Sequence, residues 1–239
     1  MRWHIIKLDS VGSTNDFIKT MNEKWAVACA DFQQAGRGQA QNKWESERGK
    51  NLLFSVKMPT PPIPADKQYL LSMAGALALK ETLDSYAYGF TLKWPNDIYW
   101  ENGKISGTLI ETAISGRLIR QCIYGIGINV NQRTFLSDAP NPISLYGIIN
   151  KETDRDELLN TLLSKLETYI SVLEEQRFDE VVSAYNKNLY RRVGFYQYED
   201  KNGRFEAEIA EVRANGYLVL RDRAGNRREY ELKEVKFII

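Results

Sequence analysis

The chain has 239 residues, of which 43% are hydrophobic, and its 32 Lys and Arg residues almost balance its 31 Asp and Glu residues. A chain of this length can bury a core as one large domain, or as one domain with a smaller companion. The net charge of +1 provides no overall field for DNA or an anionic membrane. No segment approaches the roughly 18 apolar residues that span a bilayer, and residues 1–10 lack the apolar core of a signal peptide. We therefore expect a cytoplasmic protein with neither a DNA nor a membrane partner.

The first part of the chain reads as two strands, over residues 2–8 and 25–32, with a short helix between them. Ser13 precedes an apolar helical face formed by Phe17, Ile18 and Met21, and serine is a preferred N-cap residue. Helix capping alone would account for Ser13. Cys29 and Cys122 lie in apolar runs and are most simply free, buried thiols.

A glycine-rich loop, QQAGRGQAQNKW, follows the second strand at residues 33–44. Gly36 and Gly38 flank Arg37, and glycines let backbone amides approach an anion closely. Arg37 adds a planar cation that suits a carboxylate or a phosphate. The same triplet also occurs in RNA-binding tails and in ordinary turns, but a single copy between strand-like runs does not fit a tail.

Two segments, residues 66–86 and 156–176, carry leucines and other apolar residues at helical spacing. Such amphipathic helices pack an apolar face against a sheet. We expect both helices to be structural and to perform no chemistry.

The segment KWPNDIYWENGKISGTLIE, residues 93–111, concentrates groups that bind ligands. Pro95 disfavours helix at the preceding residue, so Lys93 and Trp94 should end a strand and present their side chains at its rim. The Asn102-Gly103 pair predicts a tight hairpin that holds Lys104 beside the turn. A fixed lysine can neutralise a phosphate or a developing negative charge, and Asp97 supplies a carboxylate close by. The alternative is a solvated hairpin with two surface lysines.

From Tyr190 onwards, short alternating runs are separated by turn signals at Asn202-Gly203, Asn215-Gly216 and Gly225-Asn226. This pattern predicts a small antiparallel barrel or meander of about five strands. We expect a larger domain over residues 1–188 and a smaller one over 189–239, which is marginal alone and should dock on the larger.

Several motifs together resemble the biotin protein ligases, and they cover nearly the whole chain. They are STN at 13–15, QQAGRG at 33–38 with KW at 43–44, GKNLLFS at 49–55, KWPND at 93–97, GKISGTLIE at 103–111 and GIGINVN at 125–131. The resemblance implies an α+β fold, in which a mixed β-sheet catalytic domain with packed helices precedes a small C-terminal SH3-like β-barrel. It also implies that ATP converts biotin to biotinyl-5'-AMP, and that the biotinyl group then passes to a lysine of a biotin carboxyl carrier protein.

The resemblance implies a role for each matching residue. Catalysis falls to Lys104, Arg37 and Asp97. Biotin contacts fall to Ser13, Thr14, Asn15, Gln33, Gly36, Arg37, Gly38, Gln39 and Lys104, and ATP contacts to Lys93, Trp44 and Asn129. Mg²⁺ should arrive with ATP. Asp97 could hold it through water, orient Lys104, or accept a hydrogen bond from the incoming lysine amine, and Trp44 could equally be a core residue.

The loop departs from the pattern of many relatives, GRGRRGR, because Gln39, Ala40 and Asn42 replace arginines. This puts in question how tightly biotinyl-AMP is held, while Arg37 and Lys104 remain for activation. Many bacterial relatives also carry an N-terminal helix-turn-helix domain, but here the first strand should begin at Arg2, so we expect a short form that binds no operator. Two other functions remain open: a lipoate or octanoate ligase or transferase of the same fold, and a non-catalytic biotin-binding module.

Overall fold

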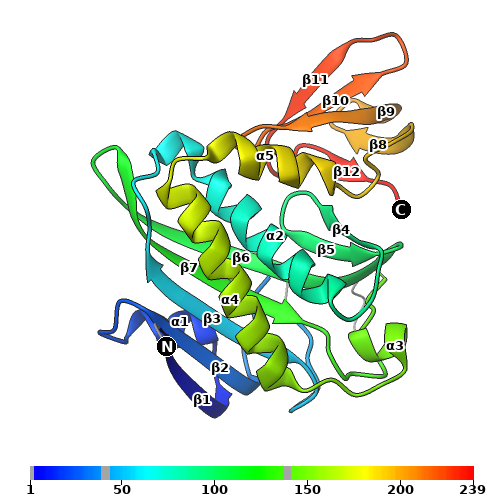
Figure 1. Cartoon of the computed structure of the whole chain (residues 1–239). Helices are drawn as coiled ribbons and strands as arrows, with labels where there is room; N and C mark the ends of the chain where they lie inside the picture. Colours follow the sequence, from blue (N-terminus) through cyan, green and yellow to red (C-terminus); the bar gives the residue numbers. More distant parts are fainter. Residues whose placement is uncertain (1–2, 39–43, 137–140) are drawn as a thin grey trace.

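The computed structural model describes residues 3–38, 44–136 and 141–239, which form two β-sheets and the helices packed on them (Figure 1). The strands of the larger sheet are β1 His4–Val11, β2 Ala26–Gln33, β3 Leu52–Pro59, β4 Phe90–Lys93, β5 Asp97–Trp100, β6 Gly103–Ser115 and β7 Leu118–Ile128. The helices are α1 Thr14–Lys19, a 3₁₀ turn Ala65–Lys67, α2 Tyr69–Asp84, α3 Leu145–Ile149, α4 Arg155–Glu174 and α5 Phe178–Lys187. The smaller sheet contains β8 Tyr196–Asp200, β9 Gly203–Val212, β10 Leu218–Asp222, β11 Arg227–Tyr230 and β12 Lys236–Phe237.

The larger sheet has seven strands in the order β1-β2-β3-β7-β6-β5-β4. Strands β1 and β2 run parallel because α1 connects them, and every other neighbouring pair is antiparallel. The predicted mixed sheet is therefore confirmed. The predicted hairpin is confirmed as well, although its two turn residues are Glu101 and Asn102, because Gly103 already pairs with Trp100 as the first residue of β6.

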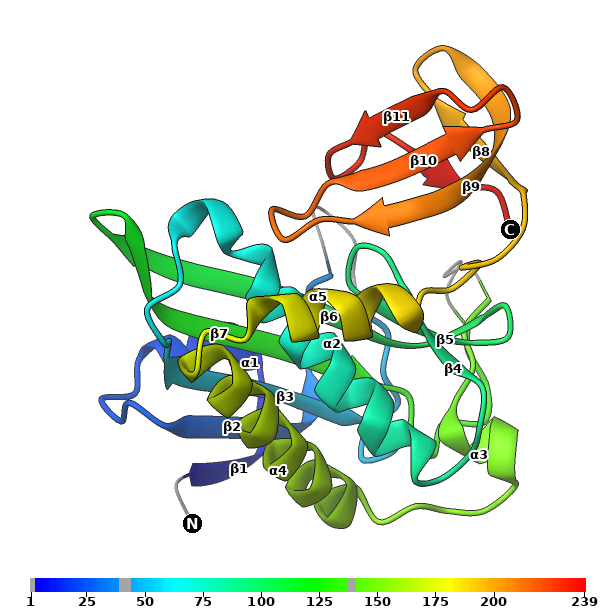
Figure 2. The same ribbon diagram turned by 45° about the horizontal axis from the view of Figure 1, so that its top comes forward.

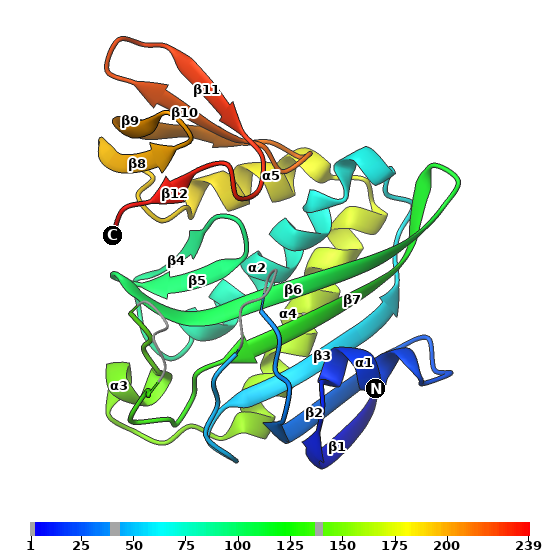
Figure 3. The ribbon, with the colours of Figure 1, turned by 180° about the vertical axis from the view of Figure 1, so that it is seen from behind.

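Helices α2 and α4 cover one face of this sheet, as Figure 1 shows. Their apolar stripes are buried, so the two helices predicted from residues 66–86 and 156–176 are confirmed as packing elements. The close approach of α2 depends on Gly75, because a Cβ atom there would lie 2.7 Å from the Tyr124 ring on β7. On the opposite face, seen from behind in Figure 3, α1 covers β2 and β3 and leaves β6 and β7 for the cavity described below.

The smaller sheet is antiparallel throughout, in the order β11-β10-β9-β8-β12, and its three predicted turns are confirmed. Among the described residues, β11 and β12 do not pair with each other, so the expected barrel is an open sheet. Figure 2 shows α5 between this sheet and α2. The boundary between residues 188 and 189 stays a prediction.

The segment that leads into the smaller sheet runs beside the edge strand β4. The Leu92 amide donates to Asn188 O at 2.8 Å, and the Tyr190 amide donates to Leu92 O at 2.9 Å. Trp94 is only 2% exposed, so the expectation that this part of the chain presents its side chains at a rim is wrong for Trp94. Residues 188–190 therefore cover that edge of the larger sheet.

Both cysteines are free, as expected, although Cys29 is only partly buried. Burial raises the pKa of the Cys29 thiol to about 11 and that of Cys122 still further, so both are protonated at neutral pH. None of the helices that the structure describes is long and apolar enough to cross a membrane.

Candidate functional site

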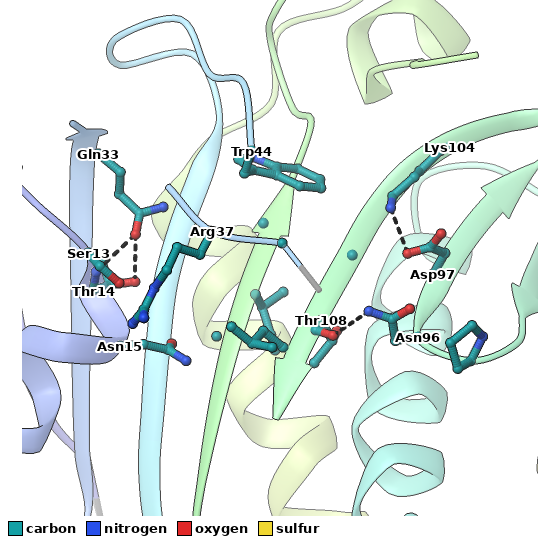
Figure 4. A pocket seen from close by; sticks show the side chains of 17 residues that line it. Ser13, Thr14, Asn15, Gln33, Arg37, Trp44, Asn96, Asp97, Lys104 and Thr108 are labelled. Carbon is teal, nitrogen blue, oxygen red and sulfur yellow. Dashed lines mark hydrogen bonds and ion pairs between the residues drawn. The ribbon is translucent and has the colours of Figure 1, made fainter. Parts of the chain in front are cut away.

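A cavity of about 210 Å³ lies on the α1 side of the larger sheet, over β6 and β7. Most of the residues that the sequence singled out line it: Ser13, Thr14, Asn15, Gln33, Arg37, Gly38, Trp44, Asp97 and Lys104. They come from α1, the end of β2 and the loop after it, the β4–β5 connection and β6 (Figure 4). Segments far apart in the chain therefore supply one site.

Neutral polar groups form the end of the cavity next to α1. The Thr14 amide and hydroxyl both donate to Gln33 Oε1, at 2.9 and 3.1 Å, which fixes the orientation of that side chain (Figure 4). The Ser55 hydroxyl lies 2.8 Å from Thr14 Oγ1, and Asn15 Nδ2 donates to Glu111 at 3.2 Å. Ser13 occupies the N-cap position but its side chain makes no capping bond, so capping does not explain this serine.

An ion pair forms the opposite end. Lys104 Nζ lies 2.7 Å from the Asp97 carboxylate and 5.8 Å from the centroid of the Trp44 ring (Figure 4). The backbone of Lys104 is held on both sides, because its amide donates to Asn141 O and its carbonyl accepts from the Ile143 amide. This lysine is thus fixed beside the turn, as the hairpin signal predicted.

A β-bulge aims Lys104 into the cavity. Ile98 pairs with Ser106 while Tyr99 pairs with Lys104, so Ile105 is the extra residue in β6. Side chains alternate along a regular strand, and Lys104 and Gly107 would then face opposite sides of the sheet. The bulge shifts this alternation, so that both positions face the cavity.

Arg37 reaches the cavity from the glycine-rich loop. Its Nη2 lies 2.5 Å from Asp16 Oδ1 on α1, and the two side chains are 46% and 58% exposed. Lys19 lies 3.6 Å from the same carboxylate. Arg37 is therefore paired at the rim, and a ligand would have to compete with Asp16 for it.

Three strand glycines form the floor of the cavity. A Cβ atom on Gly127 would lie 2.5 Å from the Trp44 ring, and one on Gly125 would lie 2.1 Å from Asn15 Oδ1. One on Gly107 would lie 3.2 Å from the same ring of Trp44. Any larger residue would fill the cavity or displace its walls. The sequence carried a signal for this floor, because an isolated glycine inside a strand pattern often marks a close approach.

Two further residues of the lining had no assigned role in the sequence. Asn96 Nδ2 donates to Thr108 O at 2.7 Å, and the Thr108 amide donates back to Asn96 O at 3.0 Å. These bonds tie the β4–β5 connection to β6 next to the ion pair. Asn96 directly precedes Asp97 in the sequence, and this position next to a predicted site residue was the one sequence feature that pointed to it.

Among the described residues, three predicted site residues, Lys93, Asn129 and Gly36, do not line the cavity. Lys93 Nζ lies over the rings of Phe237 and Tyr99, at 4.9 and 5.2 Å, and burial lowers the pKa of its ammonium group. Asn129 is buried and donates to Ile143 O at 3.1 Å, which is a structural contact.

Gly36 packs beneath Trp44, whose amide donates to Gly36 O at 3.1 Å. Gln39, together with Ala40 and Asn42, lies outside the described residues.

The described lining carries two cations, Arg37 and Lys104, and one carboxylate, Asp97. The cavity therefore offers a neutral polar end, which suits a ring with hydrogen-bonding groups, and at the opposite end the ammonium group of Lys104, which suits a carboxylate or a phosphate. Arg37 lies on the α1 side, beside the neutral end (Figure 4). The Trp44 ring lies between these ends and can pack against a flat group (Figure 4).

Comparison with known proteins agrees with this geometry. Residues 8–129, more than half of the chain, match the model of the biotin/lipoate A/B protein ligase family. The bifunctional ligase/repressor BirA of Bacillus subtilis is 32% identical over 176 residues, which are 68% of this chain and 52% of that protein. The biotin--[acetyl-CoA-carboxylase] ligase of Paracoccus denitrificans is 27% identical over 84% of this chain and 85% of its own length.

Among solved structures, the biotin protein ligase from Aquifex aeolicus in complex with biotin and ATP superposes with a TM-score of 0.80 at 26% identity. That match covers 98% of this chain and 99% of the other, so both sheets are included. The chain spans about half the length of the BirA proteins that it matches. On the family match and this superposition, the chain belongs to the biotin/lipoate A/B protein ligase family.

Proposed function

We propose that this chain activates biotin with ATP to biotinyl-5'-AMP and transfers the biotinyl group to a lysine of a biotin carboxyl carrier protein. The observation that carries the proposal is the cavity itself, which joins a neutral polar end to a cationic end beneath an aromatic ring. A lipoate or octanoate ligase shares the fold, but a dithiolane ring or an alkyl chain has no use for so polar an end.

Each end suits one part of the substrates. Thr14, Asn15 and Gln33 supply the donors and acceptors that a ureido ring requires. Lys104 at the opposite end and Arg37 at the rim next to α1 supply the cations for the carboxylate of biotin and the phosphate that it attacks. The flat face of Trp44 suits the adenine base.

The reaction begins when a carboxylate oxygen of biotin attacks the α-phosphorus of ATP. The bond from that phosphorus to the bridging oxygen then breaks, and pyrophosphate leaves with the electron pair. Negative charge accumulates around the phosphate in the transition state, where the fixed cation of Lys104 is most effective. In the second step, an uncharged lysine amine of the carrier attacks the acyl carbon and AMP leaves.

Asp97 orients Lys104, because the two side chains form a 2.7 Å ion pair. It is the only carboxylate in the described lining, and no cluster of three or more potential metal ligands occurs in the described part of the chain. One carboxylate beside a polyphosphate fits Mg²⁺, which prefers phosphate oxygens and water with few protein ligands. Mg²⁺ would thus accompany ATP and help to neutralise its charge. Asp97 is the group of the described lining that would hold it.

The acceptor is inferred from relatives. The Paracoccus denitrificans protein is named for acetyl-CoA carboxylase, so we propose the biotin-carrying part of that enzyme as the partner. The two free cysteines are consistent with the cytoplasmic location that the sequence predicts.

Exchange of labelled pyrophosphate into ATP tests the activation step. The purified chain should catalyse it only when biotin and Mg-ATP are both present, because the exchange requires reversible formation of biotinyl-AMP. Exchange that depends on lipoate or octanoate in place of biotin would reject the substrate. Biotin that raises Tm without any exchange would instead indicate a non-catalytic binding module.

Replacing Asp16 with alanine should strengthen the binding of the reaction intermediate, since it frees Arg37 from the pair at the rim. Exposed pairs contribute at most about 1 kcal/mol, so the gain should not exceed roughly fivefold. Calorimetric titration with a non-hydrolysable biotinyl-AMP analogue measures the gain. Asp66→Ala, a change to an acidic residue of the 3₁₀ turn outside the cavity, is the control and should leave the affinity unchanged. Weaker binding by Asp16→Ala would show that Asp16 aids the ligand.

A further inference from the structure

The turn between β9 and β10, in the smaller sheet, contacts the β4–β5 connection, which directly precedes Asp97. Trp94 Nε1 donates to Gly216 O at 3.0 Å, and Trp94 directly precedes Pro95. Pro95, Asn96 and Asp97 then line the cavity. The smaller sheet thus contacts this loop through the buried indole of Trp94.

Tyr69, the first residue of α2, lies in the same contact and is 7% exposed. Its ring packs on Gly216, where a Cβ atom would lie 2.9 Å from Cδ2 and 3.0 Å from Cγ of the tyrosine. Gly216 also has a φ of +95°, a conformation that glycine adopts without strain. Two separate requirements therefore favour glycine at position 216. The turn needs a positive φ, and the Tyr69 ring packs where a Cβ atom would lie. We call Gly216 the seat of the Tyr69 ring.

The Tyr69 hydroxyl connects this seat to the cavity. It lies 2.6 Å from Pro95 O and 3.1 Å from the Tyr185 hydroxyl on α5. A carbonyl oxygen can only accept, so Tyr69 gives its single proton to Pro95 and accepts one from Tyr185. Burial raises the pKa of Tyr69 well above its ordinary value, so the donor persists at every working pH.

We propose that Tyr69 is a positioning residue for adenylation, seated on Gly216 of the smaller sheet. Its hydrogen bond to Pro95 O sets the path of the loop that follows. That path places Asp97 against Lys104, and a displacement of about 1 Å at such a pair is enough to slow a reaction many-fold. This inference rests on the proposed ligase activity and deepens it, because it gives the smaller sheet a part in that activity without a direct contact to substrate.

The first test compares two variants that each remove one buried hydroxyl. Tyr69→Phe should lower kcat of biotin-dependent pyrophosphate exchange by about tenfold or more, while KM for biotin stays within about twofold because the neutral end of the cavity is intact. Tyr185→Phe removes the next hydroxyl in the chain of bonds and keeps the bond to Pro95 O, so its kcat should stay within about twofold of wild type. Equal losses in the two variants would overturn the proposal.

The double variant Tyr69→Phe/Tyr185→Phe separates positioning from stability. Tyr69→Phe alone leaves the Tyr185 hydroxyl buried without a partner, and the second substitution removes that unsatisfied group. The double variant should therefore regain Tm relative to Tyr69→Phe but should keep its low kcat. Recovery of kcat together with Tm would assign Tyr69 a merely structural role.

A pair of glycine variants tests the seat in the same way. Gly216 and Gly225 both have positive φ in turns of the smaller sheet, but a Cβ atom on Gly225 would meet nothing within 4 Å. Gly216→Ala should lower kcat about tenfold or more, and Gly225→Ala, which carries the same kind of backbone strain, should not. Similar kcat values for the two would reject a role for the seat.

Hydrogen exchange provides a readout that does not depend on activity. In the free protein, the amides of residues 96–100 should exchange faster in Tyr69→Phe than in wild type, and at the wild-type rate in Tyr185→Phe. If wild type shows no pyrophosphate exchange, the ligase proposal fails, while this comparison still decides whether Tyr69 fixes the loop. Unchanged amide exchange in Tyr69→Phe would overturn the positioning inference even in an active enzyme.

Discussion

Replacing Lys104 with alanine is expected to lower the rate of adenylation by roughly a hundredfold or more, which corresponds to about 2.7 kcal/mol of transition-state stabilisation. Lys104 Nζ lies at the cationic end of the cavity, 2.7 Å from Asp97, and the lysine backbone is hydrogen-bonded on both sides. A cation held in place needs no reorganisation as charge develops on the phosphate. Single-turnover formation of biotinyl-AMP measures this step directly.

Lys80 supplies the matched control. It forms a 2.6 Å ion pair with Asp84 on α2, and its side chain is 14% exposed, but it lies away from the cavity. Lys80→Ala removes the same charge from a similar pair, so adenylation should proceed within about twofold of wild type. If Lys104→Ala retained a rate within a few-fold of wild type, Lys104 would have no part in the mechanism.

Local sequence signals predicted the parts of the site that depend on local geometry. Pro95 and the Asn102-Gly103 signal restrict the backbone so strongly that the end of β4 and the β5–β6 hairpin could be predicted from residues 93–111 alone. The position of Lys104 beside a rigid turn followed from this. The direction of its side chain did not, because that depends on the bulge at Ile105, which no residue of β6 announces.

Long-range contacts determine the surroundings of two residues that the sequence singled out. The sequence predicts Lys93 as an ATP contact, and in the structure its ammonium group lies over the rings of Tyr99 and of Phe237, near the other end of the chain. That role stays a prediction. Ser13 has the sequence context of a capping serine, yet its side chain makes no capping bond, and it lines the cavity together with residues of β6 and β7. Patterns within one segment cannot reveal which distant segment will pack against it.

Closure of the smaller sheet was unpredictable for a related reason. Turn signals fix each hairpin, and those hairpins formed as expected. A closed barrel requires in addition that the strands at the two ends, β11 and β12, meet in register. That condition depends on the accumulated twist of the whole sheet, and the described residues leave these two strands unpaired with each other.

Replacing Gly127, in the floor of the cavity, with alanine is expected to weaken the binding of ATP. The added Cβ would lie 2.5, 2.7 and 2.8 Å from three atoms of the Trp44 indole, which are distances that real Cβ atoms do not adopt. The ring must therefore leave its place over the cavity. Stacking of a base on an aromatic ring contributes about 1–3 kcal/mol, so KM for ATP in pyrophosphate exchange should rise roughly tenfold or more.

Gly12→Ala is the control that separates displacement of the Trp44 ring from any other effect of replacing a glycine near the site. Gly12 precedes Ser13, and a Cβ atom there would meet nothing within 4 Å. Gly12→Ala should therefore leave KM for ATP within about twofold of wild type and should melt near the wild-type temperature, because its added methyl lies in open space. Trp44→Ala should match Gly127→Ala in its KM for ATP, since both remove the same surface. A KM for ATP in Trp44→Ala equal to that of wild type would mean that the adenine base does not pack on this ring. The three floor glycines would then be needed only to leave room for biotin.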